Sequence, residues 1–177
     1  MKIIAIFGPT IEHERTLAER LFEELEIPAM GLGEAAHAYD AEDQGPSRSP
    51  SPLVPVAVPA DYDFAEKRVV QHGPEHFIRR VIESLEHGEW PKQTVAITGL
   101  RTAADARLLK EHFGDDLTLV YIAPNTRDAE CRIEPADQEV LRKLADVAAT
   151  SDGKPAESEG GYEQLVNEIA RHLSSTS

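Results

Sequence analysis

Short apolar runs alternate along the chain with segments whose apolar residues recur at helical spacing. The runs predict β-strands at residues 2–7, 27–32, 93–100, 117–123 and 145–150. The first run is rich in isoleucine, which is typical of a strand buried on both faces of a parallel sheet. The helical spacing covers residues 16–26, 34–41, 61–70, 102–113 and 162–173, and further helices are predicted from Pro74 and from residues 125–128. Because strands and helices alternate, the sequence predicts an α/β fold, a three-layer sandwich with a parallel sheet flanked by helices.

Residues at the predicted helix ends support these assignments. Pro74 fits the first turn of a helix, where its missing N–H costs nothing. Thr102 is placed to cap the helix that runs to Phe113, and Asp105 lies in its first turn, where a carboxylate is favourable. Residues 174–177, after the last helix, are predicted to be a frayed tail.

Residues 43–60 interrupt the alternation. Prolines and serines crowd residues 44–52, and Pro55 and Pro59 follow, a density that excludes regular helix. We expect an exposed, mobile insertion there. Too little chain precedes it to fold alone, so residues 1–177 are expected to form a single domain.

Charge and cysteine content exclude several functions. The formal net charge is −14, from 32 acidic and 18 basic side chains, which disfavours sequence-independent binding of nucleic acid. No apolar run approaches the ~20 residues that cross a bilayer, so we expect a cytoplasmic protein without a membrane partner. The single cysteine, Cys131, excludes an intrachain disulfide and a cysteine-rich zinc site. His72 and His76 have ligand spacing, but Pro74 separates them and no third ligand is evident, so no metal site is predicted.

The turn after the first strand is the main candidate site. Ligands of parallel α/β sheets bind at the carboxyl ends of the strands, which places residues 8–16, 98–101 and 123–126 along one rim. A phosphate-binding loop there reads G-x-x-x-x-G-K-[ST], and its lysine contacts the β- and γ-phosphates. In this register His13 replaces the second glycine, Glu14 the lysine and Arg15 the first hydroxyl residue. The candidate cofactor-binding residues are Gly8, Pro9, Thr10, His13, Arg15 and Thr16.

Because Glu14 stands where the motif has lysine, the usual mode of ATP binding is disfavoured. Two like charges at ~4 Å repel by about 4 kcal/mol at an effective dielectric near 20. Arg15 is the candidate substitute cation, and hence the candidate catalytic residue. The alternative is that Glu12 and Glu14 simply stabilise the N-terminus of the following helix, where carboxylates are favourable.

Several segments, in order, resemble the adenylate kinase and dephospho-CoA kinase group of P-loop proteins, and within it archaeal uncharacterised nucleotide-kinase-like proteins. These are residues 2–8 with 16–21, 27–33, 72–80, 95–101, and 117–124 with Arg127 and Arg132. The resemblance implies a P-loop NTPase-like fold with ATP and Mg²⁺ as cofactors, although the residues themselves establish neither cofactor. It also implies an acceptor-binding site formed by Glu34, Arg79, Arg80, Arg101 and Arg132.

The chain departs from this group at positions that carry the group's catalytic chemistry. Glu14 stands at the lysine position, Thr98 at that of an aspartate, and only a short helix follows Arg132 where a long lid is expected. Because the parts of a phosphoryl-transfer site act as a unit, this combined loss predicts lost catalysis. Three interpretations stay open. The first is a degenerate kinase relative that binds a nucleotide or a partner. The second is an active nucleoside monophosphate, dephospho-CoA or small-molecule kinase with a rearranged phosphate site. The third is a structural or regulatory module that binds no nucleotide and uses the proline-rich segment to dock a protein partner.

Overall fold

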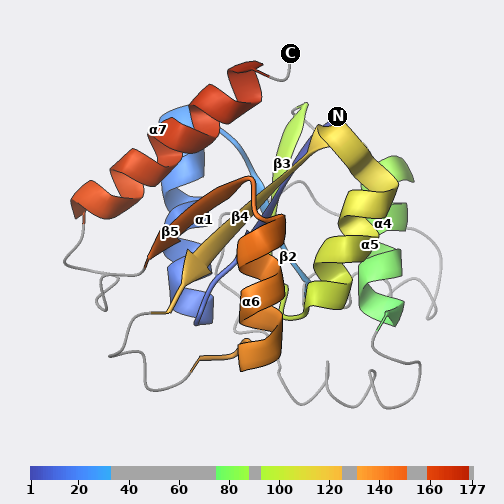
Figure 1. Ribbon diagram of the computed structural model, residues 1–177. Coiled ribbons are helices and arrows are strands. Elements are labelled where there is room, and N and C mark those ends of the chain that lie inside the picture. Colours follow the sequence, from blue (N-terminus) through green and yellow to red (C-terminus); the bar gives the residue numbers. More distant parts are fainter. Residues whose placement is uncertain (33–74, 88–92, 125–130, 151–158, 176–177) are drawn as a thin grey trace.

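The computed structural model describes residues 1–32, 75–87, 93–124, 131–150 and 159–175 (Figure 1). Four predicted segments lie outside this part of the chain: the helices at 34–41 and 61–70, the insertion at 43–60, and the helix start at 125–128. Glu34 and Arg127 lie outside it as well.

A five-stranded sheet with the order β2-β3-β1-β4-β5 forms the centre of the molecule, and all of its strand pairs are parallel. In the register of the two central pairs, Lys2 lies opposite Thr94, and Ile4 lies opposite both Ala96 and Thr118. The predicted parallel sheet is therefore confirmed. The strands are β1 (Lys2–Phe7), β2 (Ala29–Gly31), β3 (Thr94–Thr98), β4 (Leu117–Ala123) and β5 (Val147–Thr150).

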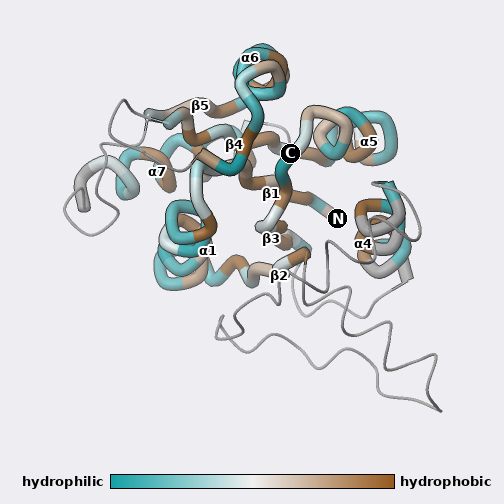
Figure 2. The backbone as a smooth tube through the Cα atoms, turned by 90° about the horizontal axis from the view of Figure 1, so that it is seen from below, coloured by the Kyte–Doolittle hydropathy of each residue, from teal (hydrophilic) through white to brown (hydrophobic). Residues whose placement is uncertain are grey.

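Helices cover both faces of the sheet, which confirms the three-layer sandwich (Figures 1 and 2). One face carries α1 and α7, and the other carries α4, α5 and α6. Alternate side chains of β1 point to opposite faces of the sheet. Phe7 packs in the core under α4 and α5, whereas Ile4 and Ile6 pack in the core under α1 and α7. The helices are α1 (Ile11–Leu25), α4 (His76–His87), α5 (Ala103–Phe113), α6 (Pro135–Leu144) and α7 (Glu159–Ser175), and a short 3-10 helix, η1 (Gly114–Asp116), precedes β4.

The N-terminus of α5 has the predicted cap in full. The Thr102 hydroxyl accepts a hydrogen bond from the backbone N–H of Asp105 at 3.1 Å, and the Asp105 carboxylate accepts one from the backbone N–H of Thr102 at 3.1 Å. This reciprocal pair satisfies two N–H groups that the helix itself leaves without partners.

Several predicted boundaries differ from the structure, and hydrogen bonds explain two of them. Helix α1 begins at Ile11 and not at residue 16, because Thr10 is its N-cap and accepts a hydrogen bond from the His13 N–H. Helix α7 continues to Ser175, so Ser174 and Ser175 are helical and not part of a frayed tail. Their hydroxyls donate to backbone carbonyls of the preceding turn, at 2.9 and 2.8 Å, which satisfies these side chains within the helix.

Candidate functional site: a buried carboxylate between two strand ends

The link between β1 and α1 is short. Only Gly8, Pro9 and Thr10 separate the two elements. Residues 11–14, which a phosphate-binding loop would hold in an open conformation, form instead the first turn of α1. The turn between β1 and α1 is therefore shorter than the sequence predicts.

Glu14 lies within this first turn and is fully buried. One carboxylate oxygen accepts a hydrogen bond from the Gly8 N–H at 3.1 Å, and the other accepts one from the Gly99 N–H at 2.5 Å. These two glycines follow directly after the neighbouring strands β1 and β3. The carboxylate therefore joins the carboxyl ends of two adjacent strands, at the rim where ligands of such sheets bind.

Glycine is favoured at both strand ends, for different reasons. A Cβ atom on Gly8 would lie 2.9 Å from Cγ of Glu14, too close for an ordinary contact. Gly99 has a φ of 88°, in the left-handed region that favours glycine, and a Cβ there would lie 3.2 Å from the Cβ of Leu32. The close approach of the carboxylate thus depends on the missing side chain at Gly8, whereas Gly99 is favoured by its own φ and by the nearness of Leu32.

Two arginines act on Glu14 from different elements. A guanidinium nitrogen of Arg132 lies 3.9 Å from a carboxylate oxygen, and the Arg132 side chain is only 16% exposed. Arg101, in the turn between β3 and α5, also favours the charged form of Glu14. Burial nevertheless outweighs these groups and the two amide hydrogen bonds, and it raises the pKa of Glu14 from 4.5 to about 7. Both protonation states are thus populated near neutral pH.

The segment before α6 holds Arg132 in place. The Arg132 backbone N–H donates to the carbonyl of Pro9 at 2.8 Å, so the segment docks on the link between β1 and α1. Gln138 braces it from α6, because its side-chain amide donates to the Ile133 carbonyl at 2.8 Å and to the Cys131 sulfur at 3.4 Å. Cys131 is half-buried and is part of this bracing.

The turn that carries Arg101 is also fixed. The Asp105 carboxylate accepts a hydrogen bond from the Arg101 backbone N–H at 3.4 Å, in addition to the capping bond of Thr102. Burial raises the pKa of Asp105, and the hydrogen bonds from Thr102 and Arg101 oppose this rise. The bond between Arg101 and Asp105 runs through the Arg101 backbone.

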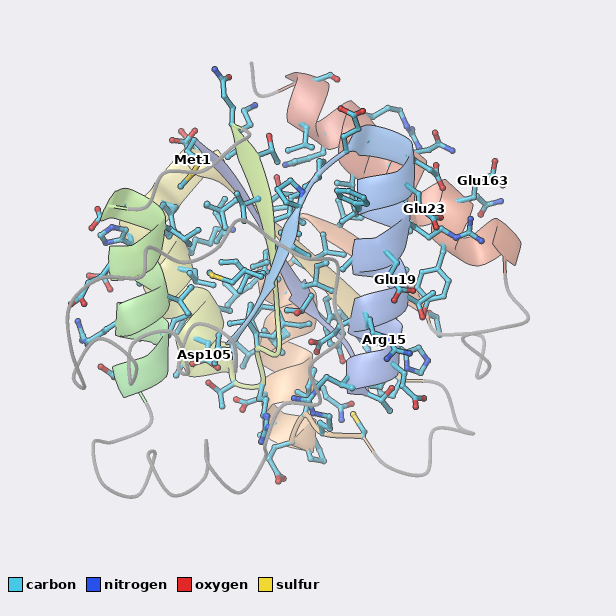
Figure 3. The ribbon with its side chains drawn as sticks, turned by 180° about the vertical axis from the view of Figure 1, so that it is seen from behind. Met1, Arg15, Glu19, Glu23, Asp105 and Glu163 are labelled. Atoms are coloured by element: carbon cyan, nitrogen blue, oxygen red, sulfur yellow. The ribbon has the colours of Figure 1, made fainter. Side chains whose placement is uncertain are left out.

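Other predicted residues of the turn lie elsewhere. The Arg15 side chain is 53% exposed, and its Nε lies 3.5 Å from a carboxylate oxygen of Glu19, one turn further along α1 (Figure 3). Glu14, in contrast, is buried. The Thr16 hydroxyl donates to the Glu12 carbonyl at 2.8 Å. His13 is buried, and its Nδ1 lies 2.7 Å from the Thr10 hydroxyl at the N-cap. The roles predicted for these residues in binding a cofactor stay predictions.

The structure brings two of the predicted acceptor residues to Glu14 and places a third on the surface. Arg101 and Arg132 both act on Glu14, so the structure brings these two together. Arg79 lies on the exposed surface of α4, where it forms an ion pair with Glu75 at 2.8 Å. The side chain of Arg80 and the whole of Glu34 lie outside the described part of the chain.

Sequence reasoning missed the position of Glu14. Glu12 and Glu14 both lie in the first turn of α1, as the alternative expected, but the Glu14 carboxylate also accepts from the strand-end amides of Gly8 and Gly99. Glu12, in contrast, is exposed in the first turn. The available signal was the helical spacing of Glu14 with Leu17, Ala18 and Leu21, which are the buried positions of α1. Within the described ranges no cluster of three metal-ligating side chains occurs, and no helix is long and apolar enough to span a membrane.

Comparison with solved structures gives the fold of the chain. The shikimate kinase of Aquifex aeolicus vf5 matches with a TM-score of 0.51 and 19% identity over 98% of this chain and 96% of that one. The chain has the fold of the P-loop kinases. The shikimate kinase of Bacteroides thetaiotaomicron matches with a TM-score of 0.52 and 13% identity over 98% of both chains.

A third match is the shikimate kinase of Acinetobacter baumannii in complex with shikimate, with a TM-score of 0.50 and 15% identity over 100% of this chain and 95% of that one. Neither a protein-family model nor a curated protein sequence matches the chain. Within the P-loop kinase fold, the Glu14 carboxylate lies at the junction of β1, β3 and α1.

Proposed function

We propose that this protein is a degenerate relative of the P-loop kinases, which lacks ordinary ATP-dependent phosphoryl transfer and acts by binding a nucleotide or a partner. The observation that carries the proposal is the buried carboxylate of Glu14, bonded to the Gly8 and Gly99 amides. Such amides at the strand ends are the donors that a phosphate would need, and here the carboxyl group of Glu14 already uses them.

The short link between β1 and α1 supports the same conclusion. A phosphate-binding loop surrounds its phosphates with successive backbone N–H groups and a lysine. Here Gly8, Pro9 and Thr10 are the whole link, and the described structure brings no lysine to Glu14. A polyphosphate at this position would meet a carboxylate, and charges of equal sign ~4 Å apart repel by about 4 kcal/mol at an effective dielectric near 20.

The retained arginines favour binding over an inert scaffold. Arg101 and Arg132 come from separate elements and act on one buried position. Arginine suits carboxylate and phosphate groups because its planar fork donates two parallel hydrogen bonds. The ligand or partner that we propose presents an anionic group to this rim.

The first experiment is a titration of the full chain with ATP, with and without Mg²⁺, by calorimetry. Phosphoryl transfer is assayed in parallel with nucleoside monophosphates, dephospho-CoA and shikimate as acceptors. We expect no Mg²⁺-dependent transfer to any of them. Turnover with one acceptor would overturn the proposal and would favour an active kinase with a rearranged phosphate site.

Arg15→Ala separates the two interpretations if turnover is found. The rearranged-site interpretation requires this substitution to abolish turnover, because Arg15 would then replace the lysine. Arg20→Ala is the matched control, since Arg20 also forms an intrahelical pair on α1, with Glu23 at 3.6 Å. Equal turnover in both variants would show that Arg15 is no substitute for the lysine.

A further inference from the structure

One tyrosine of the core carries a polar group that the site at Glu14 does not use. Tyr121 lies near the carboxyl end of β4, and its side chain is fully buried. Among the residues that the structure describes, the Tyr121 hydroxyl has no hydrogen-bond partner. A buried hydroxyl in this state destabilises the folded chain, so its presence calls for a functional explanation.

The ionisable groups that act on this hydroxyl come from the segment before α6 and from α6 itself. Burial raises the pKa of Tyr121, the Cys131 thiol adds to this rise, and Arg142 opposes it. Cys131 also packs against the apolar core to which Tyr121 belongs. The phenol of the central sheet and the single thiol of the chain are therefore neighbours in the fold.

Cys131 has polar surroundings of its own. The side-chain amide of Gln138 donates a hydrogen bond to the sulfur at 3.4 Å, and the thiol donates one to the Ile133 carbonyl at 3.5 Å. Cys131 is only half-buried, which leaves it accessible to a small reagent. The structure thus gathers a thiol, an amide and a hydroxyl from three separate parts of the chain.

We propose that Cys131 is a modification site, whose sulfur is oxidised by a hydroperoxide to the sulfenic acid, and that the Tyr121 hydroxyl assists this reaction. The inference goes beyond the proposed function and does not depend on it. A hydroperoxide suits the site because it is small enough to reach a half-buried sulfur. Its oxygens also accept the hydrogen bond that the Tyr121 hydroxyl has available.

The reaction transfers one oxygen atom to the sulfur. The thiol first loses its proton to solvent, and the thiolate sulfur attacks one peroxide oxygen. The S–O bond forms as the O–O bond breaks, and the second oxygen leaves with the electron pair and becomes water or an alcohol by taking up a proton. The sulfur is oxidised by two electrons, and the peroxide is reduced by two. The Tyr121 hydroxyl donates to the departing oxygen, where negative charge develops.

The test measures oxidation of the full, reduced chain by hydrogen peroxide. The sulfenic acid is trapped with dimedone, and the adduct is measured by mass spectrometry of the intact protein, because Cys131 is the only cysteine of the chain. We expect Tyr121→Phe to slow adduct formation roughly fivefold, the factor that one hydrogen bond of typical strength contributes. This variant should keep the fold, since it removes only a hydroxyl that has no partner among the described residues. Equal rates in the variant and the wild type would overturn the inference.

Tyr162→Phe is the matched control. It removes the hydroxyl of another buried tyrosine, which belongs to the core on the opposite face of the sheet. We expect this variant to react at the wild-type rate. If Tyr162→Phe slowed the reaction as much as Tyr121→Phe, the effect would come from a general change in the core, and the assistance by Tyr121 would be excluded.

A second measurement needs no variant. Wild-type protein is oxidised at the same peroxide concentration in buffer and after unfolding in urea. We expect the folded chain to react faster, because only the fold brings the Tyr121 hydroxyl to Cys131. A half-buried thiol without assistance reacts more slowly when folded, so an equal or slower rate in buffer would contradict the inference. The two proposals fail separately: Mg²⁺-dependent phosphoryl transfer overturns only the proposed function, and unassisted oxidation overturns only the role of Cys131.

Discussion

At the scale of the residue, the central fact is a carboxylic acid that titrates near neutrality. Burial raises the pKa of Glu14 to about 7, although Arg132, Arg101 and two amides favour its charged form. The raised pKa of Glu14 could not be predicted from sequence alone, because the Gly99 amide lies 85 positions away from Glu14. The sequence did identify Glu14, Arg101 and Arg132 as candidates. Their meeting at one point depends on tertiary contacts that no local pattern encodes.

The raised pKa makes stability depend on pH in a definite direction. A carboxyl whose pKa is higher in the folded state binds protons more tightly there, so its stabilisation is complete below pH 4.5 and is lost as the pH rises through 7. The difference between 4.5 and about 7 corresponds to about 3 kcal/mol. We expect Glu14→Gln, which stays neutral, to gain free energy of unfolding relative to wild type over this range.

Urea denaturation of both proteins at pH 4.5, 6 and 8 measures this gain. Glu12→Gln is the matched control, since it alters an exposed carboxylate in the same turn and should keep the wild-type pH dependence. A constant difference between Glu14→Gln and wild type across the three pH values would show that Glu14 does not titrate in this window.

At the scale of the element, most of the architecture was predictable from periodicity. Strands β1 and β4 have the predicted bounds, because apolar runs buried on both faces leave little ambiguity. The start of α1 was not predictable in the same way. The glycine after β1 and the spacing to Thr16 favoured an open loop, whereas the Thr10 cap and the burial of Glu14 favour helix from Ile11 onward.

The capping box of α5 gives a prediction at this scale. We expect Thr102→Ala to lower the free energy of unfolding by about 0.5–2 kcal/mol, because the Asp105 N–H then loses its partner. Thermal or chemical denaturation measures the loss. Thr102→Ser keeps the hydroxyl and should recover most of it. If serine and alanine are equally destabilising, the hydroxyl is not the origin of the effect.

At the scale of the whole molecule, the chain has the fold of the P-loop kinases. The sheet order, both helical layers and the two apolar cores are complete among the described residues. At the rim of the sheet, α1 begins directly after a three-residue link. The finer resemblance to adenylate and dephospho-CoA kinases stays a prediction.

The net charge of −14 acts on the whole molecule through self-repulsion. Because the Debye length falls from ~10 Å at 0.1 M salt to ~3 Å at 1 M, we expect Tm to rise as sodium chloride increases over this range. Calorimetric scans at constant pH measure the rise. A fall in Tm over the same range would mean that attractive pairs, and not repulsion, dominate the electrostatics of the surface.

The pairing of Lys2 with Thr94 joins positions that are 92 residues apart, 94 minus 2, at the very centre of the sheet. Closing so large a loop is an entropic cost that grows only with the logarithm of its length, by about 0.6 kcal/mol for each doubling. Insertions or deletions in the connection between these strands should therefore change the free energy of unfolding only slightly. Such non-local pairing slows the search for the native state instead, so the assembly of β1 with β3 and β4 is expected to set the folding rate.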